Sequence, residues 1–208
     1  MLKTFGKRLV TETWSAVRIT VVLLVLLGLI YPVVVWGIGQ VLFNKQANGS
    51  IITNSQGQVV GSSLIGQQFT RPEYFHGRPS ATLGADGKAL PYNASNSGAS
   101  NLGPTNLQLV ENAKGYIAQY QQENNLGPEV KLPADVVSAS GSGLDPHISV
   151  ENANLQTARV ANARKLNLEE VKATIQQHTN ERDLGILGEA RVNVLELNLA
   201  LDALQGKK

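Results

Sequence analysis

Two groups of residues in this sequence have the types or spacing that chemistry requires: three histidines, and an acid and base separated by one proline. The histidines are His76, His147 and His178, and none forms the H-x-x-x-H pair that places two metal ligands on one helix face. Structural or surface roles are therefore favoured for them, and no metal site is predicted. The 208-residue chain also has no cysteine, which excludes disulfides, thiolate metal sites and a cysteine nucleophile.

Asp145 and His147 resemble part of a hydrolase triad, and the serine- and glycine-rich run 138–143 (SASGSG) precedes them. The proline between them favours a turn, which would lead directly to a helix cap at Ser149. Backbone N–H groups in such a run can bind an anion. However, the run lacks the Lys-Ser/Thr of a P-loop and does not match the G-x-S-x-G nucleophile motif. An extended loop that packs against a partner explains it equally well, and no catalytic residue is predicted.

The charge balance argues against a nucleic-acid partner. The chain has 18 basic and 16 acidic residues, a formal charge of +2, whereas nucleic-acid-binding domains normally carry a basic patch or stripe. Charged residues make up only 16%, below the roughly 25% of typical soluble domains. Part of the chain is therefore expected to face something other than water.

That part is the stretch from Ile19 to Gln40, which carries no charge. About 20 helical residues rising about 1.5 Å each span about 30 Å, the thickness of a bilayer hydrocarbon core. The stretch is longer than the roughly 7–15 apolar residues of a cleaved signal peptide, and no A-x-A-like site follows it. We therefore predict a single transmembrane helix over 19–40, in contact with the lipid bilayer. Pro32 is expected to kink this helix, and Gly28 would let a partner helix approach closely.

The distribution of charge predicts the orientation of this span. Four of the 18 basic residues but only one of the 16 acidic residues precede it. Basic short segments stay in the cytoplasm. Residues 1–18 are therefore predicted to form a cytoplasmic basic arm, and residues 41–208 an extracytoplasmic α+β domain of a single-pass protein of the bacterial cell (inner) membrane.

The patterns within 41–208 predict one hairpin, a long ordered loop and four helices. The hairpin strands lie at 50–53 and 58–60, around a polar stretch that ends in glycine. The centre is loop-rich but contains aromatic residues, so we expect it to be ordered and docked on the domain. The helices are expected from a cap at Thr105 to a stop at Gly127–Pro128, from a cap at Ser149 to Arg164, from an Asn167/Glu170 capping box to about His178, and over Val192–Leu204.

Several long motifs in this region occur together in one family. They are GSSLIGQ (61–67) followed by Phe69, YFHGRPSA (74–81), SGASNLGPTN (97–106), PAD (133–135), ASGSGLDPHIS (139–149), GE (188–189), RVNVL (191–195) and NLALD (198–202). In these motifs the chain resembles the C subunit of the bacterial Kdp potassium-transporting P-type ATPase, over essentially the whole sequence from the span onward. Ala99 and Ala190 depart from it, where glycine and proline are usual.

The resemblance implies a complex with a channel-like potassium-binding subunit, a P-type ATPase subunit and a small membrane subunit. Such a complex uses cytoplasmic ATP to import potassium, and this type of subunit is described as a catalytic chaperone that raises the ATP affinity of the ATPase subunit. The chain itself is then a non-catalytic subunit without an intrinsic cofactor. No nucleotide-binding residue can be assigned, because nearly all candidates lie on the outer side of the span.

Three functional hypotheses remain open. In the first the outer domain sits over the external entrance of the potassium pathway, and in the second the chain acts on nucleotide handling through the arm or the span. The third is a membrane-anchored envelope hydrolase using a serine with Asp145 and His147. If loops meet a partner, Phe69, Tyr74 and Phe75 are candidate aromatic anchors and Arg78 a polar contact, with Gly28 and Pro32 contacting a partner in the membrane. The competing interpretation is that these aromatic residues fill the domain's own core.

Overall fold

The computed structural model describes residues 2–54 and 56–206, with side chains of the first helix described from residue 8 onward. The chain divides into two compact units, Met1–Ser50 and Ile51–Lys208. Each unit is described separately below.

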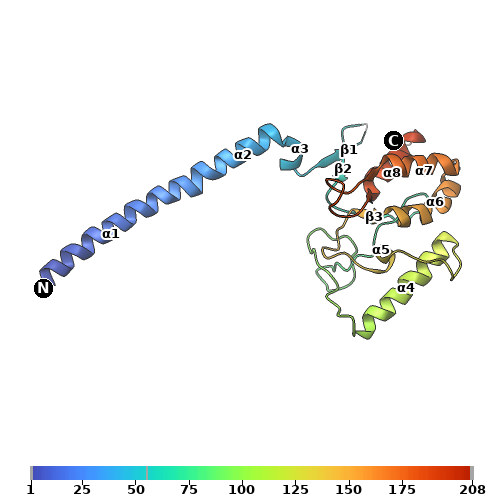
Figure 1. The fold of residues 1–208 in the computed structure, drawn as a ribbon, viewed down its shortest axis with the longest axis horizontal. Coiled ribbons are helices and arrows are strands. Elements are labelled where there is room, and N and C mark those ends of the chain that lie inside the picture. The colour runs from blue at the N-terminus through green and yellow to red at the C-terminus, as the bar shows by residue number, and fades with distance from the viewer. Residues whose placement is uncertain (1, 55, 207–208) are drawn as a thin grey trace. The chain divides into compact units, whose positions relative to one another are not determined.

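The first unit is almost entirely one helix (Figure 1). Helix α1 (Leu2–Val25) continues through a π-helical turn (Leu26–Ile30) into α2 (Tyr31–Leu42), and a short helix α3 (Asn44–Ala47) follows. The segment Arg8–Leu42 is long and apolar enough to cross a membrane, and none of its most apolar window is buried within the protein. The apolar stretch predicted at 19–40 is thus helical, and the helix also includes most of the basic arm.

A π-helical turn stands where a kink was expected. The N–H of Tyr31 donates to the carbonyl of Leu26, five residues earlier. Pro32 has no N–H, and in a regular helix its ring would clash with the carbonyl of Gly28. A wider turn just before a proline accommodates that ring. Such turns are frequent at functional sites, and the contact of Gly28 and Pro32 with a partner helix stays a prediction.

The second unit contains two small antiparallel sheets. Strands β1 (Ile51–Thr53) and β2 (Val59–Ser62) pair with Ile52 opposite Gly61, which confirms the predicted hairpin. The other sheet has the order β3-β5-β4, from His147–Ser149, Arg191–Asn193 and Thr179–Asn180. This sheet was not predicted, because strands of two or three residues are too short to show apolar alternation.

Five helices complete this unit: α4 (Leu107–Asn124), α5 (Ala134–Val137), α6 (Val150–Arg164), α7 (Leu168–Gln177) and α8 (Val194–Leu204). The Ser149 cap of α6 is confirmed, as is the capping box at the start of α7, whose C-cap is His178, at the predicted end. Because Arg191–Asn193 forms β5, the predicted helix over Val192–Leu204 begins two residues late, with Asn193 as its cap.

The predicted ends of α4 are wrong by a few residues. Its cap is Asn106 and not Thr105, and the Asn106 side chain accepts from the N–H of Gln108. Asparagine is favoured over threonine as a cap, which explains the shift. The helix stops at Asn125 in the left-handed conformation (φ 53°), before Gly127 is reached. Asparagine tolerates this conformation better than most residues, so no glycine is required.

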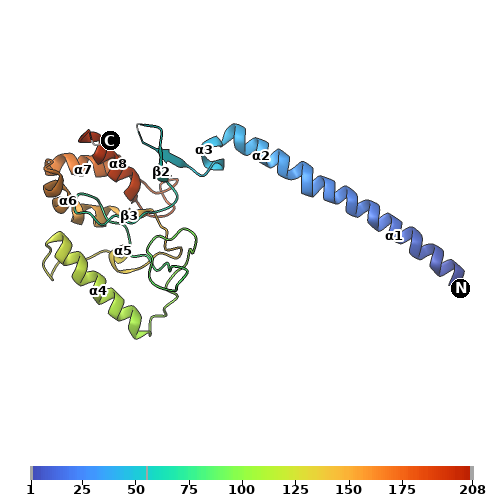
Figure 2. The ribbon, with the colours of Figure 1, turned by 180° about the vertical axis from the view of Figure 1, so that it is seen from behind.

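The core lies among α6, α7, α8 and the three-stranded sheet. Figure 2 shows these elements gathered on one side of the unit, with α4 on the other. The core cluster consists of Phe75, Ile148, Ala153, Val160, Ala161, Val171, Ile175, Val192, Val194, Leu197 and Leu201. Phe75 contributes to this cluster from the long loop between β2 and α4, and the partly buried Phe69 of the same loop packs against the cluster, so the loop is anchored to the core as expected.

Candidate interaction site

Side chains from α6 and α8 hold the loop segment 72–76 by its backbone. Asn198 forms two hydrogen bonds with Phe75, accepting from its N–H at 2.8 Å and donating to its carbonyl at 3.0 Å. Gln156 makes the same pair with His76, at 2.8 and 3.1 Å. Each buried amide thus replaces a neighbouring strand, which satisfies backbone groups that burial would otherwise leave without partners.

Two arginines of α6 extend this arrangement. Arg159 Nη1 donates to the carbonyls of Pro72 and Tyr74, at 2.6 and 2.8 Å. Arg164 Nε donates to the carbonyl of Glu73 at 2.6 Å. The segment 72–76 is irregular but fixed, and the predicted ordering of the central loop is confirmed.

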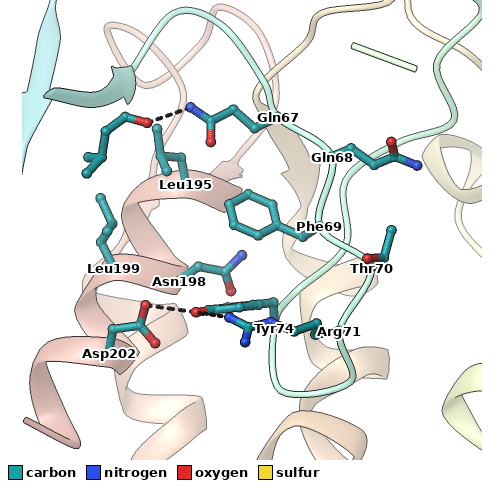
Figure 3. A pocket seen from close by; sticks show the side chains of 11 residues that line it. Gln67, Gln68, Phe69, Thr70, Arg71, Tyr74, Leu195, Asn198, Leu199 and Asp202 are labelled. Carbon is teal, nitrogen blue, oxygen red and sulfur yellow. Dashed lines mark hydrogen bonds between the residues drawn. The ribbon is translucent and has the colours of Figure 1, made fainter. Parts of the chain in front are cut away.

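Two of the predicted contact residues, Phe69 and Tyr74, line a surface pocket of about 450 Å³ next to this segment. Figure 3 shows residues 67–71 and Tyr74 along one side and Leu195, Asn198, Leu199 and Asp202 of α8 along the other. Gln67 closes one end, with its Nε2 donating to the carbonyl of Val60 at 2.8 Å. The pocket therefore combines aliphatic and aromatic walls with a charged end at Asp202.

Tyr74 is the centre of the charged end. Its hydroxyl donates to Asp202 Oδ2 at 3.2 Å and accepts from Arg71 Nη2 at 2.9 Å. The guanidinium groups of Arg71 and Arg164 lie 4.8 and 5.0 Å from its ring centroid, and the ring of Phe69 is 5.3 Å away. Burial and the Asp202 carboxylate raise the pKa of Tyr74, so the hydroxyl keeps its proton. This arrangement fixes the tyrosine ring at the rim of the pocket.

The other four residues predicted to contact partners lie elsewhere. Phe75 has no exposed surface and belongs to the core, so we withdraw it as an anchor in favour of the competing core interpretation. Arg78 pairs with Asp145 through Nη1 and Oδ2 at 2.9 Å, and about a quarter of its side chain remains exposed. Gly28 and Pro32 flank or lie within the π-helical turn of the first unit.

The acid and base of the hydrolase hypothesis are in contact, but they are linked to the scaffold. Asp145 Oδ1 lies 3.4 Å from His147 Nδ1 and accepts from the His147 N–H at 3.0 Å. Burial alone would raise the pKa of Asp145, but the hydrogen bonds from His147 and the Arg78 charge outweigh it and lower the pKa. Asp145 is thus an ionised carboxylate that joins the loop carrying Arg78 to the start of β3.

The loop 138–143 packs against the rest of its own domain. The N–H of Gly143 donates to the carbonyl of Ser140, and the N–H of Leu144 to the hydroxyl of Ser142. The carbonyl of Ser142 accepts from the N–H of Gly98 and the hydroxyl of Ser97. One N–H group of the suggested anion cradle, that of Gly143, therefore has a partner within the loop, and the N–H of Ser138 donates to the carbonyl of Ala134.

The histidines contact carboxylates or backbone. His76 Nδ1 lies 3.2 Å from Glu123 Oε2, and burial together with Arg159 lowers the pKa of His76. His178 Nδ1 is 2.9 Å from the carbonyl of Thr174. Among residues 2–54 and 56–206, no three His, Asp or Glu side chains are grouped as a metal ion would require.

Our sequence reasoning missed the polar residues that hold the loop: Gln156, Arg159, Arg164, Asn198 and Asp202. One signal for two of them was present, because Asn198 and Asp202 stand four residues apart among leucines and alanines in NLALDAL. That spacing puts both polar groups on one helix face. A polar pair within such an apolar helix indicates buried hydrogen-bonding groups.

Comparison with known proteins agrees with the resemblance noted in the motifs. The family profile described as "K+-transporting ATPase, c chain" matches residues 13–203. The chain is 48% identical to the potassium-transporting ATPase KdpC subunit of Gloeobacter violaceus over 93% of its length and 97% of the relative. It is 49% identical to that of Mycobacterium bovis, over 91% and 96%, and 51% identical to that of Paraburkholderia phymatum, over 88% and 92%. The chain therefore belongs to the KdpC family.

Proposed function

We propose that this chain is a non-catalytic subunit of an ATP-driven potassium import complex, anchored by one transmembrane helix with its N-terminus in the cytoplasm. The observation that carries the proposal is the helix of the first unit, which exposes apolar side chains from Ile19 to Ile38 with no charged residue among them. Such a surface requires lipid or another subunit around it. The basic residues ahead of the apolar stretch favour the cytoplasmic side for the N-terminus.

The second unit is then the external part of the subunit, and we propose that it lies over the entrance of the potassium pathway. The pocket beside Tyr74 supports a docking role, because aromatic and arginine side chains at a pocket rim are typical of interface anchors. Phe69 and Tyr74 remain the proposed contact residues at this pocket, Arg78 remains a proposed polar contact elsewhere on the second unit, and Gly28 with Pro32 are proposed contacts in the membrane. The partners are a potassium-binding subunit, a P-type ATPase subunit and a small membrane subunit.

An effect of this chain on ATP hydrolysis would act by coupling and not through a nucleotide bound to loop 138–143. The N–H groups of Ser138 and Gly143 in that loop already donate to the carbonyls of Ala134 and Ser140. Coupling between distant sites does not require contact with the ligand. ATP and potassium are thus used by the complex, and this chain would change the affinity of the ATPase subunit for ATP through the span or the assembly.

The test is a mild-detergent purification on a C-terminal tag, from cells that express the whole transport operon. We expect co-purification of a P-type ATPase and a potassium-binding subunit, with ATP hydrolysis stimulated by potassium. A matched strain lacking only this chain should lose growth at low external potassium. Recovery of the tagged chain alone would contradict the proposal.

A further inference from the structure

The connection between β4 and β5 is a hairpin whose tip is apolar and exposed. Leu184, Ile186 and Leu187 are 89%, 77% and 56% exposed. Scattered apolar residues on a surface are normal, but three on one projecting turn form a patch. The tip belongs to none of the contacts described above.

The backbone of this hairpin is built to hold the tip in place. Asp183 and Leu187 exchange two hydrogen bonds of 2.9 Å, and the N–H of Gly185 donates to the carbonyl of Arg182. The base continues the β4–β5 pair, in which Asn180 stands opposite Arg191. Val192 of β5 is fully buried, so the sheet from which the hairpin extends is part of the core. The hairpin therefore presents its apolar residues in a fixed arrangement.

Leu184 also adopts the left-handed conformation (φ 56°), which is unfavourable for a leucine. Asparagine or glycine would fit this position better by backbone geometry alone. The position therefore bears a large apolar side chain against its local conformational preference. A contact made by that side chain would explain why leucine is present at this position.

The charges around the tip indicate which kind of surface covers it. Arg182 pairs with Glu189, and Arg191 with Asp183, so the flanks are largely neutralised within the hairpin. Glu181 leaves a small acidic surplus, and residues 181–191 contain no lysine and no aromatic residue. Loops that insert into membranes are typically basic, with tryptophan or tyrosine at the headgroup level. An apolar cleft on a protein fits this tip better than a lipid surface.

We infer that the hairpin tip docks into an apolar cleft on another subunit of the potassium-transport complex. This inference rests on the proposed function, because it requires that the chain assembles with such subunits. It adds a contact from the edge of the core sheet, separate from the pocket beside Tyr74. Neutral, self-paired flanks let the tip enter the cleft without burying an unpaired charge.

The test compares the double variant Leu184→Asn with Ile186→Asn against Leu107→Asn, in the full-length chain within the complex. Asparagine tolerates the backbone conformation at 184, so the variant keeps its fold, which a thermal melt of the purified chain verifies. Leu107, at the start of α4, is 78% exposed and serves as the matched control. We expect recovery of partner subunits to fall about tenfold or more in the double variant, because two apolar side chains that the proposed contact would bury are lost. Recovery should stay unchanged in the control.

A photo-crosslinking amino acid at position 186 identifies the occupant directly. We expect an adduct with one of the transport subunits, identified by mass spectrometry. Full recovery of partners in the double variant, an equal loss in the control, or adducts only with lipid or with a second copy of this chain would overturn the inference. If the unmodified chain recovers no subunits at all, the proposed function itself fails, which is a different result.

Discussion

The two units of this protein use apolar and polar side chains in opposite ways. In the first unit the apolar residues are outside: Val33, Val34 and Val35 are 56%, 53% and 48% exposed. In the second unit the interior contains amides and charged groups together with the aliphatic core, and Asn198, Gln156 and Arg164 are at most 4% exposed. The first unit thus depends on what surrounds it, whereas the second unit is held together by its own hydrogen bonds.

The two units are therefore sensitive to different kinds of substitution. A buried amide that replaces a strand leaves two backbone groups without partners when it is removed. A side chain on an exposed helix surface has no such partner within the protein, so its loss is felt only in association. Substitutions in the two units should therefore affect different measurements.

The largest effect on stability is expected for Asn198→Ala. The change leaves the buried N–H and carbonyl of Phe75 unsatisfied, which costs about 3 kcal/mol of unfolding free energy. For a domain of this size the melting temperature should fall by roughly 6–12 °C. Gln122→Ala, at an exposed position of α4, is the control and should change the melting temperature by no more than about 2 °C. Equal melting temperatures for the two variants would contradict the importance of the buried amide.

Gly143→Ala should have the next largest effect. Gly143 has φ 68°, and an added Cβ would lie 2.5 Å from Thr82 Cγ2 and 2.7 Å from the carbonyl oxygen of Gly98. We expect a loss of about 2–3 kcal/mol in denaturant unfolding, from both strain and the clash. Gly87→Ala has the same backbone strain (φ 75°) but meets nothing within 4 Å, so it should cost only about 1 kcal/mol. Identical losses would show that the packing around loop 138–143 is loose.

A smaller, pH-dependent effect is expected at Asp145. Because the folded state lowers the pKa of this carboxyl, its contribution to stability is present above the unfolded pKa of about 3.9 and is lost as the pH falls through the lower folded value. The pair with Arg78, in which about a quarter of each side chain is exposed, is worth about 1 kcal/mol. Asp145→Asn should therefore be less stable than the unmodified protein near neutral pH, with the gap closing in strong acid. Denaturant titrations at several pH values measure this, and a gap independent of pH would refute the ion-pair account.

Gly28→Ile should leave the stability of the second unit unchanged. An added Cβ at Gly28 meets no atom within 4 Å, so nothing within the protein is disturbed. If a partner helix packs there, co-purification of partner subunits should weaken, because small residues permit close helix approach in membranes. Gly37→Ile, also without a neighbour within 4 Å, is the matched control. Equal recovery with both variants would remove the π-helical turn as a contact site.

The sequence predicted the parts of the fold that depend on local signals. The apolar helix, the β1–β2 hairpin, the Ser149 cap and the Asn167/Glu170 capping box each follow from residues close together in the chain. The sheet β3-β5-β4 did not, because its strands are held by pairing between residues such as Ile148 and Val192, far apart in sequence. The core position of Phe75 likewise depends on Asn198, which is 123 residues away.

The candidate site was predictable only in part, for the same reason. Aromatic residues in the motifs indicated the region of Phe69 and Tyr74. Whether an aromatic side chain lines the pocket, as these two do, or lies in the core, as Phe75 does, depends on its contacts with α8, which is distant in sequence. Arg78 was expected to make a polar contact, and its partner Asp145 was noted only as part of a hydrolase hypothesis. Long-range hydrogen bonds set these positions, and composition and spacing do not encode them.

The most direct test of the contrast between the two units is cysteine labelling in intact cells, which is clean because the chain has no cysteine of its own. Thr4→Cys reports on the basic arm, and Lys88→Cys, where the side chain is 86% exposed, reports on the second unit. A membrane-impermeant maleimide is added after the outer envelope is opened. We expect labelling at position 88, and no labelling at position 4 until the inner membrane is permeabilised. Labelling at position 4 with protection at position 88, or labelling at both positions before permeabilisation, would contradict this expectation.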